Sequence, residues 1–253
     1  MEIVEKKYKN WSIFYSSLSN DLFEEKLGEK IIDTDYNIVK ILKDTKRNYV
    51  AVVMIDSIKY VLKEFRSEII IPQRKIQTFF KEGEAVTTLK NGISAINDGI
   101  IELVKPIVAI VKRRKLIEKS YLLIEYIEGE KIQTKEDVDK ILLLTEKIHK
   151  LGRYHGDLNT SNFIRENNTI RILDTQMKKE KKFFYKRAYD ILTLEEDILV
   201  SKYLFYNVRS SYKYLKKDIG YFLAVFIKYL KKTKIISKIK SYKKKLRKKG
   251  WKI

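Results

Sequence analysis

The sequence lacks cysteine and has few residues of several other kinds that proteins use for chemistry. With no cysteine, the chain has no disulfides, no thiolate zinc sites and no cysteine nucleophile. Its two histidines, His149 and His155, are too few for a histidine-based metal site. No apolar run follows the first residues, and the longest apolar stretch, Ile219–Ile227, is too short to span a bilayer. We therefore expect no signal peptide and a soluble protein of the cytoplasm.

Acidic residues are also outnumbered, and none follows Asp218. The chain carries 54 Lys and Arg against 33 Asp and Glu, a formal net charge of +21. A codon bias toward Lys, Ile, Asn and Tyr would explain part of this excess, but it should raise Glu as well. Such a protein is attracted to polyanions, which include nucleic acid, an anionic membrane face and phosphorylated substrates. Residues 219–253, here called the basic carboxyl-terminal region, are the most one-sided part of the chain.

What the sequence does contain is enough apolar material for a folded protein, with 44% hydrophobic residues among 253. The first 35 residues mix aromatic and charged side chains and predict a short helix or an irregular entry. Apolar residues at helical spacing then predict a helix within Gln77–Ile100. Runs rich in β-formers and bounded by turn residues predict strands at Asn37–Leu42, Tyr49–Ile55, Lys59–Phe65, Ile101–Lys112 and Tyr121–Tyr126.

The second half of the chain is mainly helical in its pattern. Thr134 and Asp137 have the spacing of a capping box before an amphipathic helix. Asn167-Asn168 predicts a tight turn before a strand over Thr169–Leu173. Further helices are expected at Val138–His149, Tyr189–Tyr203, Ser210–Lys217, Ile219–Leu230 and Ile235–Lys248. The order of strands and helices indicates an α+β protein.

Between these parts lies the most informative motif, Tyr154–Phe163, which reads Y-H-G-D-L-N-T-S-N-F. An Asp five residues before an Asn, followed by an apolar pair and a second Asp, is the spacing of the protein-kinase catalytic loop and metal-binding strand. In this pattern Asp157 is the candidate catalytic base, which accepts the proton of the attacking hydroxyl. Asn162 and Asp174 are the candidate Mg²⁺ ligands. The alternative for Asp157 is a turn residue with a capping role.

The motif predicts a two-lobed protein-kinase-like fold that binds ATP. Residues 1–127 would form a small antiparallel-sheet lobe, and residues 128–253 a mainly helical lobe with the catalytic loop and the basic tail. Lys63 follows apolar residues in the third strand, where a kinase lysine binds the α- and β-phosphates. Glu84, rather than Glu82, is the preferred acidic partner from the next helix. The backbone at Glu125 and Ile127 would form the hinge that binds adenine.

The chain departs from the protein-kinase pattern at three places. No glycine-rich loop covers the phosphates, and Lys43–Asn48 stands there instead, with Thr45, backbone amides or the Lys46-Arg47 pair as candidates for that role. Gly156 occupies the place of the arginine that pairs with a phosphorylated activation loop. The triplet after the metal strand is Asp174-Thr175-Gln176 and not Asp-Phe-Gly. These departures indicate a constitutively competent enzyme that is not a regulated protein kinase. His155 is expected to pack beneath the loop, and Asp190 to steady the loop from a following helix.

Taken together, these motifs and the basic helical carboxyl terminus resemble the lipopolysaccharide core heptose(II) kinase family. The resemblance runs from about Asn37 to Lys249, and its specific residues lie in Tyr154–Gln176. It implies a bacterial enzyme, peripheral at the cytoplasmic face of the inner membrane, that uses ATP to phosphorylate a heptose of the lipopolysaccharide inner core. An anionic glycolipid in an anionic bilayer also suits the basic carboxyl-terminal region. For Ile219–Leu230 itself we favour packing on the helical lobe, with a solvated lysine face.

Three other functions remain open from the sequence. One is another small-molecule or sugar kinase of this fold, acting on Kdo, an aminoglycoside or choline, although a strongly basic protein suits cationic substrates poorly. Another is a protein kinase, which the three departures oppose. The last is a catalytically dead basic module that binds membrane or nucleic acid. The joint presence of Lys63, Asp157, Asn162 and Asp174 opposes a dead module, and no specific nucleic acid is expected.

Overall fold

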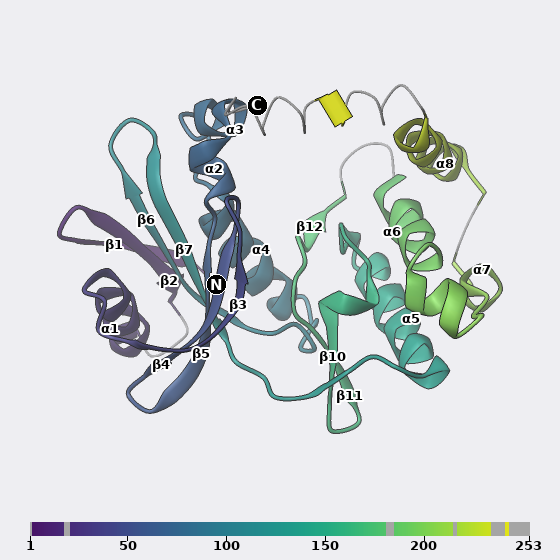
Figure 1. Ribbon diagram of the computed structural model, residues 1–253, viewed down its shortest axis with the longest axis horizontal. Coiled ribbons are helices and arrows are strands. Elements are labelled where there is room, and N and C mark those ends of the chain that lie inside the picture. Colours follow the sequence, from purple (N-terminus) through teal and green to yellow (C-terminus); the bar gives the residue numbers. More distant parts are fainter. Residues whose placement is uncertain (1, 18–20, 181–184, 215–216, 234–240, 243–253) are drawn as a thin grey trace. The chain divides into compact units, whose positions relative to one another are not determined.

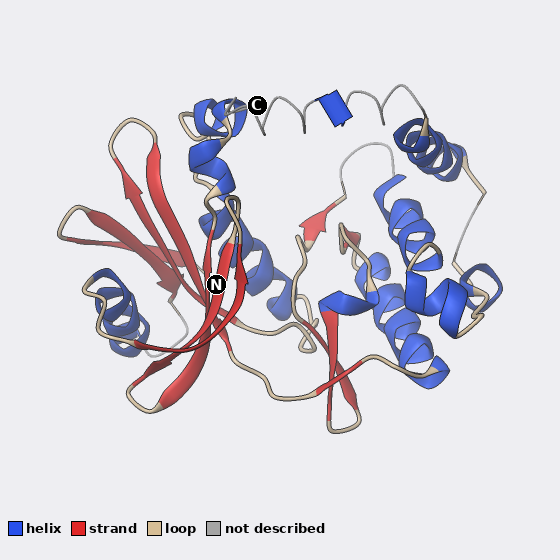
Figure 2. Cartoon of the chain, viewed as in Figure 1, coloured by secondary structure: helices blue, strands red, loops and turns tan. Residues whose placement is uncertain are grey.

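The computed structural model describes residues 2–17, 21–180, 185–214, 217–233 and 241–242. Two compact units hold these residues. Unit 1 contains Met1–Asn97 and Val104–Ile127, and unit 2 contains Asp98–Leu103 and Glu128–Lys249. Strands predominate in the first and helices in the second (Figure 2). The α+β class is confirmed, and a large antiparallel sheet together with a mainly helical unit is compatible with a two-lobed kinase-like fold.

In the described part of unit 1, seven antiparallel strands form one sheet in the order β1-β2-β6-β7-β5-β4-β3. Each predicted strand run contains a strand, although the run predicted from Ile101 becomes a strand only at Pro106. The edge strand β3 is exposed along its whole length and carries Lys40 and Lys43, charges that discourage pairing with another chain. The strands span Ile3–Tyr8 (β1), Trp11–Ser16 (β2), Asn37–Asp44 (β3), Tyr49–Ile55 (β4), Ile58–Glu64 (β5), Pro106–Arg113 (β6) and Ile117–Glu125 (β7).

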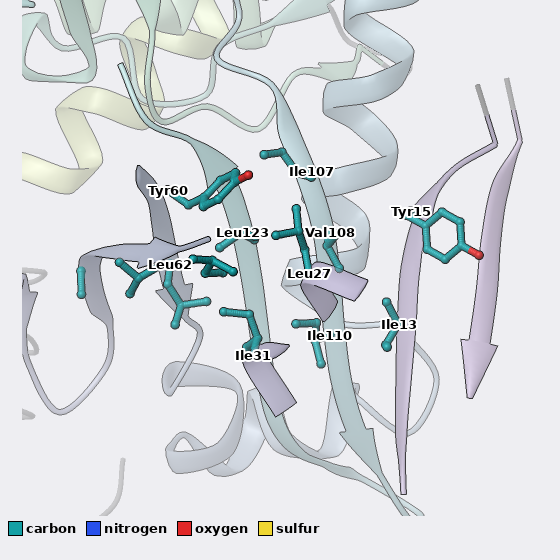
Figure 3. Close-up of a cluster of buried hydrophobic side chains, with 13 residues drawn as sticks. Ile13, Tyr15, Leu27, Ile31, Tyr60, Leu62, Ile107, Val108, Ile110 and Leu123 are labelled. Carbon is teal, nitrogen blue, oxygen red and sulfur yellow. The ribbon is translucent and has the colours of Figure 1, made fainter. Parts of the chain in front are cut away.

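Helices cover both sides of this sheet (Figure 1). Successive side chains of a strand point to opposite faces, so apolar residues on both faces need a covering helix. Helix α1 (Asp21–Ile32) contacts β2 and β6 and buries Leu27 and Ile31 in a core with Ile13 and Ile110 (Figure 3). Helix α4 (Glu84–Asn97) contacts β6 and β7 through a separate row of buried apolar residues. Two short helices, α2 (Ser67–Ile70) and α3 (Pro72–Gln77), connect β5 to α4.

The prediction for the first 35 residues was wrong about their main structure. Ile3–Tyr8 and Trp11–Ser16 form a β-hairpin that extends the sheet, and only α1 is helical. The two strands meet at a tight turn in which Lys9 has a φ of 53°, a left-handed conformation normally signalled by Asn or Gly. The charged sequence of β1 shows little alternation, and Asn10 is the single turn signal, so the local signal for the hairpin was weak.

Unit 2 consists of short strands before and after the motif and of helices. A capping box opens α5 (Lys135–Lys150), since Thr134 and Asp137 exchange side-chain and backbone bonds as predicted. The strands are β8 (Glu130–Lys131), β9 (Arg153–Tyr154), β10 (Phe163–Glu166), β11 (Thr169–Ile172) and β12 (Lys178–Lys179), and they form sheets β11-β10-β8 and β12-β9. The other helices are α6 (Tyr185–Glu195), a π-helical turn (Leu199–Tyr203), α7 (Val208–Ser211) and α8 (Ile219–Lys232).

Two predicted helices differ from the structure, and a third is not tested by it. The one expected over Tyr189–Tyr203 is divided, because α6 ends at Glu195 and Asp197 turns the chain by accepting a bond from the Leu199 N–H at 2.8 Å. The one expected over Ser210–Lys217 stops at Ser211. The Ile235–Lys248 helix lies almost wholly outside the described residues. Among the residues that are described, no helix is long and apolar enough to cross a membrane.

Candidate active site

The motif forms a loop whose own polar groups fix Asp157 and Asn162 next to each other. The loop leaves β9, passes Asp157 and makes one turn of 3₁₀ helix at Thr160–Asn162 before β10. The Nδ2 of Asn162 donates to the main-chain oxygen of Asp157 at 2.7 Å and reaches its carboxylate at 3.3 Å. Asn159 donates to the same carboxylate at 2.6 Å. The Asp157 side chain is therefore held in one orientation by two amides.

Asp174 is brought to the same place by the β10–β11 hairpin. Phe163 and Ile172 are opposite partners in that hairpin, and the N–H of Leu173 donates to the oxygen of Asn162 at 2.9 Å. Asp174 follows directly. Because the Nδ2 of Asn162 is turned toward Asp157, its side-chain oxygen faces away and can accept a cation. An amide oxygen and a carboxylate are hard oxygen ligands of the kind that Mg²⁺ uses together with substrate phosphates, so the donor set fits this ion.

The loop is anchored from beneath by Asp190 of α6, as predicted. Its carboxylate is 1% exposed and accepts the N–H of His155 at 2.6 Å and that of Gly156 at 2.9 Å. His149 approaches the same carboxylate through Nε2 at 3.4 Å, and its Nδ1 lies 2.6 Å from the hydroxyl of Tyr212. A buried carboxylate that accepts several hydrogen bonds is a strong positional restraint. Asp190 thus fixes the two residues that lead into Asp157.

His155 and Gly156 have structural tasks in this loop. His155 is fully buried, its ring packs against Phe163 and its Nδ1 accepts the N–H of Asp157 at 3.3 Å, which confirms the predicted packing role. Burial lowers the pKa of His155, which favours a neutral ring. Gly156 has a φ of +91°, and a Cβ there would stand 3.1 Å from the Gln176 side chain. The backbone therefore demands glycine where protein kinases carry arginine.

A further residue, Arg153, ties the segment after Asp174 to the catalytic loop. Its guanidinium is 1% exposed and donates to Met177 O at 2.6 Å and to Asp98 at 2.6 and 3.0 Å. Thr175 and Gln176 also bind the main-chain oxygen of His155, both at 3.0 Å. The sequence analysis did not identify Arg153, because its partner Asp98 lies 55 residues away and no motif marks the pair.

In unit 1, Lys63 and the predicted hinge lie on neighbouring strands. Lys63 is near the end of β5, opposite Leu122 of β7, and Glu125 ends β7 opposite Tyr60. The N–H of Glu125 donates to Lys105 O at 3.0 Å, and its carboxylate accepts the Lys105 N–H at 3.2 Å. A contact from Glu125 to adenine would therefore use its carbonyl oxygen. Ile127 is buried just beyond the strand.

Glu84, the predicted partner of Lys63, lies in the first turn of α4. Its carboxylate pairs with Arg74 at 2.7 Å, and Arg74 also binds the hydroxyl of Ser67 at 3.0 Å. The N–H of Glu84 donates to the carboxylate of Glu68 at 2.7 Å. Glu68 is buried, and this burial raises its pKa to about 7. A carboxylate that the sequence did not single out thus supports the start of the helix that carries Glu84.

Glu68 makes the stability of the protein depend on pH. Its folded-state pKa of about 7 lies above the ordinary value of 4.5, so the folded state retains a proton that the unfolded chain releases. Stability should therefore fall as pH rises from about 4.5 to about 7, by about 3 kcal/mol. Glu68→Gln should remove this loss and exceed the parent in stability at pH 8. Urea unfolding at pH 5 and 8 measures it, with Glu82→Gln as the surface control; an unchanged pH profile in Glu68→Gln would contradict the assignment.

The segment that replaces the glycine-rich loop is a compact turn between β3 and β4. The hydroxyl of Thr45 accepts the Asn48 N–H and donates to Asn48 O, both at 3.0 Å. It also accepts the N–H of Arg47 at 3.4 Å. Thr45 and these amides are therefore engaged within the turn itself. The side chains of Lys46 and Arg47 are left as the candidates for phosphate contact.

Known proteins resemble the chain over nearly its full length. The family model described as "Lipopolysaccharide core biosynthesis protein (WaaY)" matches residues 2–243. A relative from Escherichia coli (strain K12), named lipopolysaccharide core heptose(II) kinase WaaY, is 24% identical over 238 residues, which cover 89% of this chain and 93% of the relative. A second from Escherichia coli, with the same name, is 22% identical over 245 residues, covering 94% and 98%. The resemblance inferred from the motifs is confirmed.

Proposed function

The chain belongs to the family of lipopolysaccharide core biosynthesis proteins (WaaY), and on this premise we propose that it transfers the γ-phosphoryl group of ATP to a heptose hydroxyl of the lipopolysaccharide inner core. The arrangement of Asp157, Asn162 and Asp174 carries the proposal, because phosphoryl transfer needs a carboxylate beside the attacking hydroxyl and oxygen ligands for a metal on the phosphates. The names of the two relatives support heptose as the acceptor.

In this reaction Asp157 orients the heptose hydroxyl and takes its proton. The hydroxyl oxygen forms a bond to the γ-phosphorus as the bond from that phosphorus to the bridging oxygen of ADP breaks, and the electron pair leaves with ADP. Because Asn159 and Asn162 hold the carboxylate, it needs no rearrangement before the proton moves. Asn162 and Asp174 would hold Mg²⁺, which neutralises charge on the phosphates when bound.

The ATP itself would be bound by residues of unit 1. Lys63 would bind the α- and β-phosphates, and Glu84 would be its acidic partner. The backbone at Glu125 and Ile127 would bind adenine. The fixed backbone between Thr175 and Lys179 supports a site that needs no phosphorylated activation loop, since Arg153 and the main chain of His155 already hold that segment.

We place the enzyme at the cytoplasmic face of the inner membrane, because its acceptor would be an anionic glycolipid in an anionic bilayer. The basic carboxyl-terminal region, in which no Asp or Glu follows Asp218, supports this location. Of that region, the structure describes α8, Thr233 and the pair Ser241-Tyr242.

Phosphorylation of purified acceptor tests the function. With ATP and Mg²⁺, the protein should add one phosphate to core glycolipid that carries unphosphorylated heptose, and mass spectrometry of the released oligosaccharide should place it on heptose. Glycolipid cut back before heptose is the matched control and should gain nothing, and EDTA should abolish transfer. Equal transfer to the heptose-free control, or to kanamycin, choline or a peptide, would contradict heptose as the acceptor and identify another one. The absence of transfer to any of them would indicate a module without activity.

A further inference from the structure

Helix α8 has two apolar faces, and only one of them is used in packing. One face buries Gly220, Tyr221 and Ala224 against Ala188 and Leu192 of α6. Packing on the helical unit is therefore confirmed for this helix, as favoured from the sequence. The opposite face was expected to be a solvated lysine face. It is instead apolar and largely aromatic, because Ile219, Phe222, Phe226 and Tyr229 recur at helical spacing and are 82%, 62%, 55% and 67% exposed.

The lysines of α8 lie toward α6 and leave this aromatic face without charge. Lys228 donates to the main-chain oxygen of Leu192 at 2.9 Å and to Glu196 at 2.7 Å. Lys232 binds the same carboxylate at 2.8 Å, and Lys231 binds the hydroxyl of Tyr189 at 2.7 Å. Glu196 is thus neutralised by two lysines, and Asp218, the N-cap of the helix, accepts the N–H of Tyr221. The exposed face of α8 is therefore apolar, and the three lysines lie on the other side of the helix.

We propose that the exposed stripe of Ile219, Phe222, Phe226 and Tyr229 enters the headgroup region of an anionic bilayer and holds the enzyme on the membrane. Exposed aromatic rings on one side and lysines on the other are typical of helices that lie in a membrane interface. The charge of the whole chain, +21, opposes the alternative of a second copy on this face, because two such chains repel each other. The sequence after Asp218 contains lysines and no acidic residue, and its positive charge is complementary to anionic lipid.

This membrane contact rests on the proposed function, because the lipid-embedded acceptor is the reason for the enzyme to bind a membrane. A lipid-embedded acceptor reaches an enzyme that is held at the bilayer surface at a higher local concentration. The stripe would therefore increase transfer to glycolipid in vesicles. It should leave transfer to the same core oligosaccharide free in solution unchanged, because none of its residues belongs to the candidate active site.

Vesicle flotation of the full chain tests the stripe. Phe222→Ser with Phe226→Ser should weaken binding to vesicles of phosphatidylcholine with roughly 30% phosphatidylglycerol by roughly tenfold or more. The matched control is Phe79→Ser with Phe80→Ser, which changes two exposed phenylalanines of unit 1 and should bind as the parent does. Raising salt from about 0.1 M to about 0.5 M should weaken the parent and both variants, since the basic charge is common to them.

Each other outcome overturns the proposal. Parental binding by the α8 variant, or equal weakening by the control variant, would remove the stripe as the insertion element. A parent that sediments as a dimer without lipid, and as a monomer after the α8 changes, would assign the face to a second copy. If the α8 variant bound vesicles as the parent does but no longer bound an acidic protein, the exposed face would be the binding site for that protein. Failure of the proposed function would look different from failure of the membrane contact. The parent would then phosphorylate no core oligosaccharide in solution, while the difference in vesicle flotation between the parent and the α8 variant would remain.

Discussion

Asp157→Asn should reduce the rate of phosphoryl transfer by about 10³-fold while ATP binding stays within about twofold of the parent. The substitution keeps the size of the side chain and removes the group that accepts the hydroxyl proton. The variant should fold, because the Asp157 carboxylate is held by amides at the surface of the loop and forms no buried pair. Single-turnover transfer to soluble core oligosaccharide measures the rate, and fluorescent-nucleotide titration measures binding.

A matched variant separates the loss of the base from the loss of any aspartate. Asp35→Asn changes a side chain that is 71% exposed in unit 1 and should transfer phosphate at the parental rate. If Asp157→Asn also transferred at the parental rate, another group would be the base. If it failed to bind ATP, Asp157 would be part of the nucleotide site and the assignment would again be wrong.

The parts of the site that could be predicted from the sequence are those held by neighbours in the chain. The spacing from Asp157 to Asn162 and on to Asp174 is set by one loop and one hairpin, and the bond from Leu173 N to Asn162 O closes it. The capping box at Thr134 is likewise contained within four residues. In such places residue type and spacing already specify the hydrogen bonds.

The supporting residues could not be predicted because their partners are distant in sequence. Arg153 is specified by Asp98, and the buried state of Glu68 by the strand and helix that close over it. Nothing local distinguishes either from an ordinary surface charge. The same holds for α8, whose pattern shows apolar positions on two faces. Only the packing of α6 decides which face is buried and which is left exposed.

Asp190→Asn should lower both the stability of the protein and the rate of phosphoryl transfer. The new amide places an N–H₂ group where a carboxylate oxygen accepted a backbone N–H, so at least one of the bonds to His155 and Gly156 is lost in a buried position. Hydrogen bonds to a charged group contribute about 1.5–3 kcal/mol each, so the free energy of unfolding should fall by about 3 kcal/mol. Urea denaturation at constant pH measures it.

The effect on the rate follows from position, because Gly156 directly precedes Asp157. A shift of about 1 Å in a reacting group costs roughly 10²-fold, so kcat should fall roughly that far at a temperature where the variant is folded, while the KM for ATP changes little. Asp139→Asn, on the exposed side of α5 and bound to the hydroxyl of Tyr206, is the matched control in the same unit. If the Asp190→Asn variant were destabilised but kept the parental kcat, Asp190 would have a role in stability alone. Because its two oxygens bind the two amides that precede Asp157, we expect stability and rate to fall together.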